Sequence, residues 1–164
     1  MLYRLAKESD IDEICRLIRN AIVNMEKNDI FQWDNIYPAK EDFLSDIKKQ
    51  QLFVGLLNKD ISVLYTINKE CDREYENGKW KHPDLEYRII HRLCVNPEYQ
   101  NRGIAKGALL HIEQELKKQG VKSIRLDVFS KNPHALSLYL NNGYEKTGCA
   151  EWRKGRFFLM EKYL

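Results

Sequence analysis

The sequence predicts an α/β fold in which helices cover both faces of a mixed β-sheet. Two observations support this expectation. Amphipathic segments with helical spacing alternate with short β-rich runs, and 43% of the 164 residues are hydrophobic, enough for one core without disulfides or metals. The expected order of elements is β-α-α-β-β-β-α-β-α-β-β. Residues 1–164 are therefore expected to form one domain, without internal repeats or low-complexity segments.

The first half of the chain is expected to contain three strands and two helices. Apolar residues recur at helical spacing from Ile11 to Met25, and Ser9 followed by Asp12 resembles a capping box before them. The tripeptide Asn58-Lys59-Asp60 separates two β-rich runs and predicts a hairpin. The expected elements are a strand over 2–6, a helix over 11–25, a shorter helix after Pro38, strands over 52–57 and 61–67, and a polar loop over 69–84.

The second half is expected to contain two helices that each end at a glycine. Gly120 and Gly143 are the predicted terminators, and Asn132 is a predicted N-cap. The expected elements are a strand over 86–95, a helix over 103–119, a strand over 121–129, a helix over 133–142, and strands over 144–149 and 156–163.

The charge balance argues against a dedicated nucleic-acid binder. The formal net charge is +3, and the 27 basic residues are interleaved with 24 acidic ones, as on an ordinary solvated surface. One alternative stays open. Folding could gather Lys48, Lys49, Lys117 and Lys118 onto one face, and nucleic-acid binding there would weaken steeply with salt.

The cysteines and the apolar runs define the expected compartment. The four cysteines are far apart and form no C-x-x-C pair, so neither a zinc knuckle nor a redox motif is indicated. No apolar run approaches the roughly 20 residues needed to span a bilayer. The N-terminus lacks the basic-then-apolar layout of a signal peptide. We therefore expect a cytoplasmic protein with reduced thiols, without a metal and without a membrane partner.

The most informative stretch is 93–106, where a strand, a tight turn and the start of a helix follow one another. Free N–H groups and the positive end of the helix dipole make such a turn a natural anion site. Gly103 and Ala105 let the backbone approach phosphate oxygens, and Arg102 and Lys106 add positive charge. The patterns G-x-G-x-x-G and G-x-x-x-x-G-K-S/T are both absent. A simple packing turn is the alternative interpretation.

Two motifs follow this layout. The first is Q/R-x-x-G-x-G/A after a strand that ends like L-x-V-x-P, matched by Gln100, Gly103, Ala105, Leu93, Val95 and Pro97. The second is N-x-x-A-x-x-x-Y-x-x-x-G-F/Y, matched by Asn132, Ala135, Tyr139, Gly143 and Tyr144. With both motifs in order, the chain resembles the GNAT superfamily of acyl-CoA N-acyltransferases. The resemblance implies a mixed, mostly antiparallel twisted sheet, and over residues 1–84 it extends only to the order of elements.

The resemblance implies a site for acetyl-CoA, the acyl donor. The strand residues Leu93, Cys94 and Val95 would pair with the pantetheine arm through their backbone. The pyrophosphate would lie on the turn formed by Gln100, Asn101, Arg102, Gly103, Ile104, Ala105 and Lys106. Asn132 would hydrogen-bond the pantetheine, and Tyr139 would protonate the departing thiolate. Taken alone, Asn132 could merely cap its helix and Tyr139 could be core, and Cys94 is expected to be packing.

The general base and the acceptor pocket are less defined. Glu86 and His91 precede the turn on the expected strand, and a histidine ordinarily titrates near neutral pH. Both could instead be solvated strand residues, and Asp127 is a further candidate that could merely pair with Arg125 or Arg92. The region 31–38 is expected to shape the acceptor site, with Trp33 and Tyr37 either packing at the core edge or contacting the substrate.

Three functions follow from these features. The leading one is transfer of an acetyl group to a primary amine of a small molecule or peptide, by a monomer or homodimer. The second is a catalytically silent CoA-binding sensor, which would keep the turn but would not need Tyr139. The third is the nucleic-acid-associated protein already described.

Overall fold

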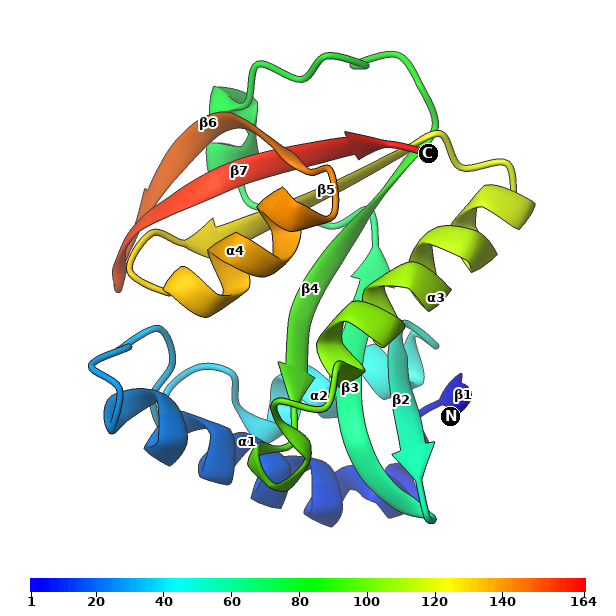
Figure 1. The fold of residues 1–164 in the computed structure, drawn as a ribbon, viewed down its shortest axis with the longest axis vertical. Coiled ribbons are helices and arrows are strands. Elements are labelled where there is room, and N and C mark those ends of the chain that lie inside the picture. The colour runs from blue at the N-terminus through cyan, green and yellow to red at the C-terminus, as the bar shows by residue number, and fades with distance from the viewer. The chain divides into compact units, whose positions relative to one another are not determined.

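The computed structural model describes residues 1–164, and its helices and strands follow the predicted order (Figure 1). The strands are β1 (Leu2–Leu5), β2 (Leu52–Leu57), β3 (Asp60–Asn68), β4 (Tyr87–Val95), β5 (Ser123–Phe129), β6 (Glu145–Trp152) and β7 (Gly155–Tyr163). The helices are α1 (Ile11–Glu26), α2 (Lys40–Lys48), α3 (Ile104–Lys118) and α4 (Pro133–Asn141), with short 3-10 turns η1 (Glu8–Asp10), η2 (Arg73–Asn77) and η3 (Pro97–Tyr99). None of these helices has the length and apolar character of a membrane span.

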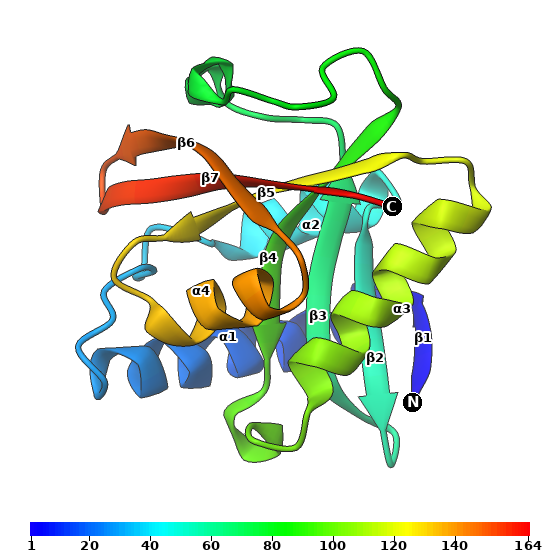
Figure 2. The same cartoon turned by 45° about the horizontal axis from the view of Figure 1, so that its top comes forward.

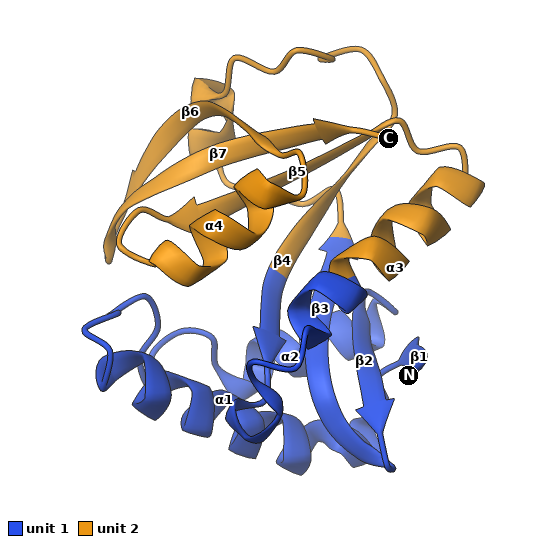
Figure 3. Cartoon of the chain, in the orientation of Figure 1, with its two compact units in different colours: residues 1–67, 92–108 blue, residues 68–91, 109–164 orange.

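The chain divides into two compact units (Figure 3). The first unit contains residues 1–67 and 92–108, and the second contains residues 68–91 and 109–164. Strand β4 is divided between the units after residue 91, and helix α3 is divided after residue 108. The β4–β5 pairing is parallel, whereas β1–β2, β2–β3, β5–β7 and β6–β7 are antiparallel. The predicted mixed, mostly antiparallel sheet is therefore confirmed.

In the first unit the strand order is β1-β2-β3-β4, and helices pack on both faces. On one face, apolar side chains of α1 and α2 form a core with those of β2 and β3. On the other face, Ile104 and Ala108 of α3 pack against Val63 of β3. Figures 1 and 2 show α1 and the first turns of α3 on opposite sides of β3. Helix α1 is held against the sheet by the buried side chains of Ile14 and Leu17. Burial of each such side chain stabilises the fold by about 1.5–3 kcal/mol.

In the second unit the strand order is β4-β5-β7-β6. The pairing of β4 with β5 runs from Tyr87 opposite Ser123 to Ile90 opposite Leu126. Strand β5 continues against β7 as far as Phe129 opposite Phe157. The two strands β6 and β7 form a hairpin, and their turn ends at Gly155, whose φ of 122° favours glycine.

The start of α1 differs from the prediction. The capping box at Ser9 and Asp12 is wrong, because Ser9 lies inside η1 and the helix begins at Ile11. The carboxylate of Asp10 instead accepts a hydrogen bond of 2.8 Å from the backbone N–H of Lys7. It also accepts two hydrogen bonds from Arg4, of 2.7 and 2.9 Å, which hold the turn beside β1.

Two boundaries further along the chain also shift. The segment predicted as a loop over 69–84 contains η2. Glu86 lies one residue before β4, whereas a strand was expected from that position. The helix predicted over 103–119 spans Ile104–Lys118, so Gly103 belongs to the turn before it.

Candidate active site

The turn between β4 and α3 lies within the first unit and has the backbone of an anion-binding site. Asn96 begins it by accepting a hydrogen bond of 3.2 Å from the N–H of Glu98. Asn101 and Gly103 then adopt left-handed conformations, with φ of 60° and 74°. The first N–H groups of a helix have no partner within the helix and carry its positive dipole end. The turn therefore presents backbone donors directly after Gly103.

The side chains of this turn are anchored within the first unit. Asn24 of α1 donates a hydrogen bond of 3.1 Å to the Oε1 atom of Gln100. The guanidinium carbon of Arg102 lies 5.4 Å from the ring centroid of Tyr99, whose hydroxyl donates to Asp60 at 2.9 Å. Lys106 is exposed on the first turn of α3. Two exposed cationic side chains thus lie on the turn.

The side chains of the strand residues before the turn point alternately into two apolar clusters on opposite faces of the sheet. Leu93 and Val95 pack with Ile104, and Cys94 points into the opposite core with α1 and α2. Burial raises the pKa of the Cys94 thiol to about 12. A thiol that stays protonated near neutral pH is a poor nucleophile, so Cys94 acts as a small apolar side chain.

The second unit brings His91, Asp127 and Tyr75 to the end of the β4–β5 pairing. His91 and Asp127 are the first residues on their strands after the last paired residues, Ile90 and Leu126. The hydroxyl of Tyr75, from η2, donates a hydrogen bond of 2.7 Å to Oδ1 of Asp127. The Nε2 atom of His91 lies 2.9 Å from Oδ1 of Asn68.

Helix α4 positions the residues of the second motif. The side-chain oxygen of Asn132 accepts a hydrogen bond of 3.0 Å from the N–H of Ala135, so the predicted N-cap is confirmed. Tyr139 is buried, at 7% exposure, and its ring meets that of Tyr144 edge-on with centroids 5.5 Å apart. Burial, and then the negative charge of Asp127, raise the pKa of Tyr139. Its phenol therefore stays protonated at neutral pH.

Glu86 has a different environment, in solvent. Its carboxylate accepts a hydrogen bond of 2.8 Å from Lys69 and another from Arg88. These two cationic partners lower the pKa of Glu86. A carboxylate that is stabilised in its charged form is a weaker proton acceptor.

The segment 31–38 belongs to the first unit and places its two predicted aromatic residues differently. Trp33 is 8% exposed and packs in the core with α1 and α2. Tyr37 is 41% exposed, and its hydroxyl accepts a hydrogen bond of 3.0 Å from Arg92. Asp34 closes the segment by accepting hydrogen bonds from the N–H groups of Ile36 and Tyr37, at 3.0 and 3.2 Å.

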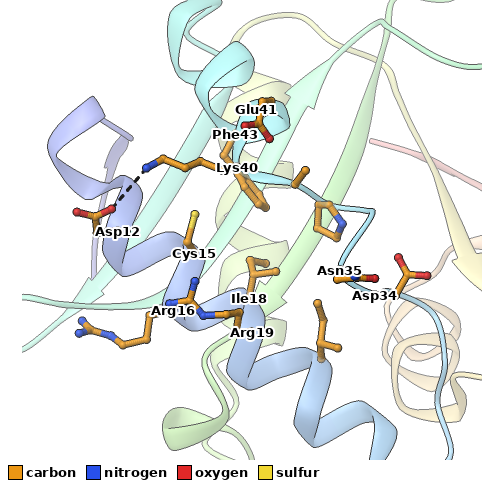
Figure 4. Close-up of a pocket in the computed structure, with 13 residues that line it drawn as sticks. Asp12, Cys15, Arg16, Ile18, Arg19, Asp34, Asn35, Lys40, Glu41 and Phe43 are labelled. Atoms are coloured by element: carbon orange, nitrogen blue, oxygen red, sulfur yellow. Dashed lines mark ion pairs between the residues drawn. The ribbon is translucent and has the colours of Figure 1, made fainter.

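A cavity of about 630 Å³ lies in the first unit beside the same segment (Figure 4). Its walls come from α1, from residues 34–39 and from the start of α2. Ile18 and Phe43 line it with apolar surface, and the ion pair of Asp12 with Lys40, 3.7 Å apart, lies at its edge. The segment 31–38 is thus both packed against the core and part of a cavity wall.

Comparison with known proteins agrees with these features. The model of the acetyltransferase (GNAT) family matches residues 21–144, and the chain belongs to this family. The ribosomal protein bS18-alanine N-acetyltransferase of Escherichia coli is 32% identical over 62 residues. That match covers 38% of this chain and 42% of the relative, so the chain spans less than half the length of this curated relative.

Two solved structures share the fold over nearly the whole chain. A GNAT-family acetyltransferase from Streptococcus agalactiae has a TM-score of 0.84 at 23% identity, and the match covers 99% of this chain and 95% of that one. The PaiA N-acetyltransferase of Thermoplasma acidophilum, solved in complex with coenzyme A, has a TM-score of 0.73 at 19% identity. That match covers 99% of this chain and 98% of the other.

Two contacts were not predicted from the sequence, that of Tyr75 with Asp127 in the second unit and that of Arg92 with Asp46 in the first. Tyr75 lies in a polar segment where nothing in the pattern indicated a buried hydroxyl donor. Arg92 lies in a strand where the sequence Ile89–Val95 predicts uninterrupted extended backbone. Only the structure shows that Arg92 is left-handed, with φ of 53°.

Proposed function

We propose that this protein transfers an acetyl group from acetyl-CoA to a primary amine of a small molecule or peptide. The observation that carries the proposal is the left-handed Gly103 directly before α3, in a chain that belongs to the GNAT family. Transfer takes place in a ternary complex. The amine nitrogen attacks the thioester carbonyl, the tetrahedral intermediate collapses, and the carbon–sulfur bond breaks to release CoA.

The donor binds through backbone groups. The pyrophosphate lies against the N–H groups of Gly103, Ile104, Ala105 and Lys106, with Arg102 adding charge. Gln100 and Asn101 shape the approach of the chain to this turn. The backbone of Leu93, Cys94 and Val95 pairs with the pantetheine arm, and the side-chain amide of Asn132 donates to it. Correct placement of the two reactants supplies a large part of the rate enhancement.

Tyr139 is proposed as the general acid. A departing thiolate needs a proton, and a phenol with a raised pKa holds its proton until that moment. Burial of the ring keeps the hydroxyl in a fixed position. A CoA-binding sensor would not need a tyrosine at this position, so the register of Tyr139 with Asn132 and Gly143 supports the enzyme over the sensor.

Asp127 and His91 are the proposed proton acceptors for the amine. Asp127 is favoured because its charge acts on Tyr139, the proposed general acid, and because the Tyr75 hydroxyl that orients its carboxylate is neutral, whereas the donors to Glu86 are cationic. The same negative charge would attract the ammonium form of the acceptor. His91, whose ring contacts Asn68, is the second candidate. Glu86 is disfavoured, because two cationic partners lower its pKa.

The acceptor is proposed to bind near segment 31–38. Phe31 and Tyr37 are the exposed aromatic residues there, at 52% and 41%, and Tyr37, which the hydrogen bond from Arg92 orients, is proposed to contact the acceptor. Trp33 is buried in the core, where it packs segment 31–38 against the first unit, and it is not proposed to contact the substrate.

The experiment that tests this function measures thiol release from acetyl-CoA with a panel of amines, including polyamines, amino acids and peptides with free N-termini. The wild type should release CoA with at least one acceptor, and mass spectrometry should find the acetylated amine. Tyr139→Phe should lose about 10²-fold in kcat with little change in stability, whereas Tyr163→Phe, at an exposed tyrosine, should keep the wild-type rate. Tight CoA binding without transfer to any amine would favour the sensor.

A further inference from the structure

Arg92 is the only non-glycine residue of β4 with a positive φ, and its side chain turns into the first unit. The side chain is 12% exposed, which is unusual for arginine unless the charge is paired. Its guanidinium carbon lies 5.8 Å from the ring centroids of both Tyr37 and Phe43. One arginine therefore contacts segment 31–38 and helix α2 from the strand.

The charge of Arg92 is balanced by Asp46 of α2, whose side chain is 8% exposed. The Nη2 group of Arg92 donates to Oδ2 of Asp46, and the same oxygen accepts a hydrogen bond of 2.8 Å from the hydroxyl of Thr66 on β3. The carboxylate is thus fixed from two strands. Neither hydrogen bond to Asp46 involves Tyr37, so we expect this carboxylate to keep its orientation when the Tyr37 contact is removed.

The second end of the guanidinium reaches Tyr37. Nη1 of Arg92 donates to the Tyr37 hydroxyl at 3.0 Å, while Nε is buried without a partner. Only a planar fork can reach a carboxylate and a phenol at the same time in this way. A left-handed backbone and an unpaired buried N–H both cost free energy, and such features persist where the surrounding structure enforces them.

We propose that Arg92 is a positioning residue that fixes segment 31–38 against α2 and β4 and thereby sets the affinity for the amine acceptor. This inference rests on the proposed function. The ion pair with Asp46 fixes the guanidinium of Arg92 against helix α2. The hydrogen bond from Arg92 to Tyr37 then holds segment 31–38 against this guanidinium. The proposed donor site uses backbone groups of residues 93–95 and of the turn after them, and the Arg92 side chain supplies none of these groups, so CoA affinity should not depend on the Tyr37 contact.

The substitution Arg92→Lys tests the contact with Tyr37 separately from the ion pair with Asp46. A lysine keeps a positive charge against Asp46 but has no fork with which to reach Tyr37 as well. Tyr37→Phe removes the same hydrogen bond from the other side and leaves the buried ion pair intact. Arg156→Lys, which makes the same exchange at an exposed arginine paired with Glu151, is the matched control.

The experiment combines hydrogen exchange with binding and steady-state kinetics. In both Arg92→Lys and Tyr37→Phe, amide exchange in 31–38 should become about tenfold faster or more, while CoA affinity stays within about twofold. The KM for the amine should rise about tenfold with a smaller change in kcat, and the two substitutions should be non-additive in the double variant. Arg156→Lys should change none of these quantities.

Different results would overturn the positioning role of Arg92 and the proposed acetyl transfer. Unchanged exchange in 31–38 and an unchanged amine KM in Arg92→Lys would overturn the positioning role. So would additive effects in the double variant. If the wild type acetylates no amine, the proposed function fails, and the exchange data alone then decide whether Arg92 holds the segment. An Arg92→Lys protein that loses CoA affinity as strongly as amine affinity would also overturn the proposal, because it would indicate general unfolding of the unit.

Discussion

Gly103 and Gly120 stand at the two ends of helix α3 with nearly the same backbone conformation, at φ of 74° and 81°. At neither position would an added Cβ meet another atom within 4 Å. A valine at either site therefore causes similar left-handed strain, of about 1–2 kcal/mol. The two positions share this strain, and only the turn at Gly103 is proposed to bind CoA.

This pair gives a matched test of the CoA site. Gly103→Val and Gly120→Val should lower thermal stability to a similar extent, and only Gly103→Val should abolish CoA binding, because its side chain blocks the approach of the phosphates. Isothermal titration with CoA measures the affinity of each folded variant. Equal affinity in the two proteins would rule out the turn as the pyrophosphate site.

The proton acceptor can be identified by substitution. Asp127→Asn keeps an oxygen for the Tyr75 hydrogen bond but removes the negative charge, so kcat should fall by about 10²-fold. Glu86→Gln should leave the rate near that of the wild type, because this carboxylate is exposed and held by Lys69 and Arg88. Steady-state rates with one acceptor provide the comparison. A large loss in His91→Gln with none in Asp127→Asn would assign the role to His91.

The turn before α1 should make the protein sensitive to acid. Hydrogen bonds from Arg4, and then from the backbone of Lys7, lower the pKa of Asp10 against the opposing effect of burial. Because the folded-state pKa lies below the unfolded value of about 3.9, the stabilisation is complete above that pH and is lost as the pH falls through the folded pKa. Asp10→Asn should cost about 1–2 kcal/mol at neutral pH and less in acid.

Urea titrations at neutral and acidic pH measure this difference. The gap between wild type and Asp10→Asn should narrow as the pH falls toward the folded-state pKa. A gap that stays constant over the whole range would show that Asp10 stabilises the turn through its shape and not through its charge.

Thiol labelling should distinguish the cysteines by burial. Cys149 is exposed and should react with a maleimide in mildly alkaline buffer, whereas Cys94 is buried with a pKa raised to about 12 and should react only after unfolding. Peptide mass spectrometry locates the adducts. Rapid labelling of Cys94 in the native protein would contradict its role as a packing residue, and Cys94→Ala should retain acetyl transfer.

The order of helices and strands could be predicted from sequence because it depends on local patterns. The apolar spacing of α1, the hairpin between β2 and β3, and the cap at Asn132 all lie within short windows, where periodicity and capping chemistry are informative. The two motifs likewise combine a strand, a turn and a helix that are adjacent in the chain.

The contacts that were missed join residues distant in sequence. Tyr75 meets Asp127 across 52 positions, and Arg92 meets Asp46 across 46. No local pattern encodes such a pair, because either residue alone is also typical of a solvated surface. The burial of Trp33 was left open for the same reason, since its partners lie on α1 and on strands formed later in the chain.

The interleaving of the two units affects how this protein can be divided. The backbone passes from one unit to the other three times, after residues 67, 91 and 108. A stop codon after residue 108 would keep both segments of the first unit, but residues 68–91 of the second unit would remain between them, and any earlier stop would remove residues of both units. Neither unit can be produced as a simple fragment. A separate unit would have to be made by splicing its two segments together, because the segments alternate along the chain and no circular permutation brings them next to each other.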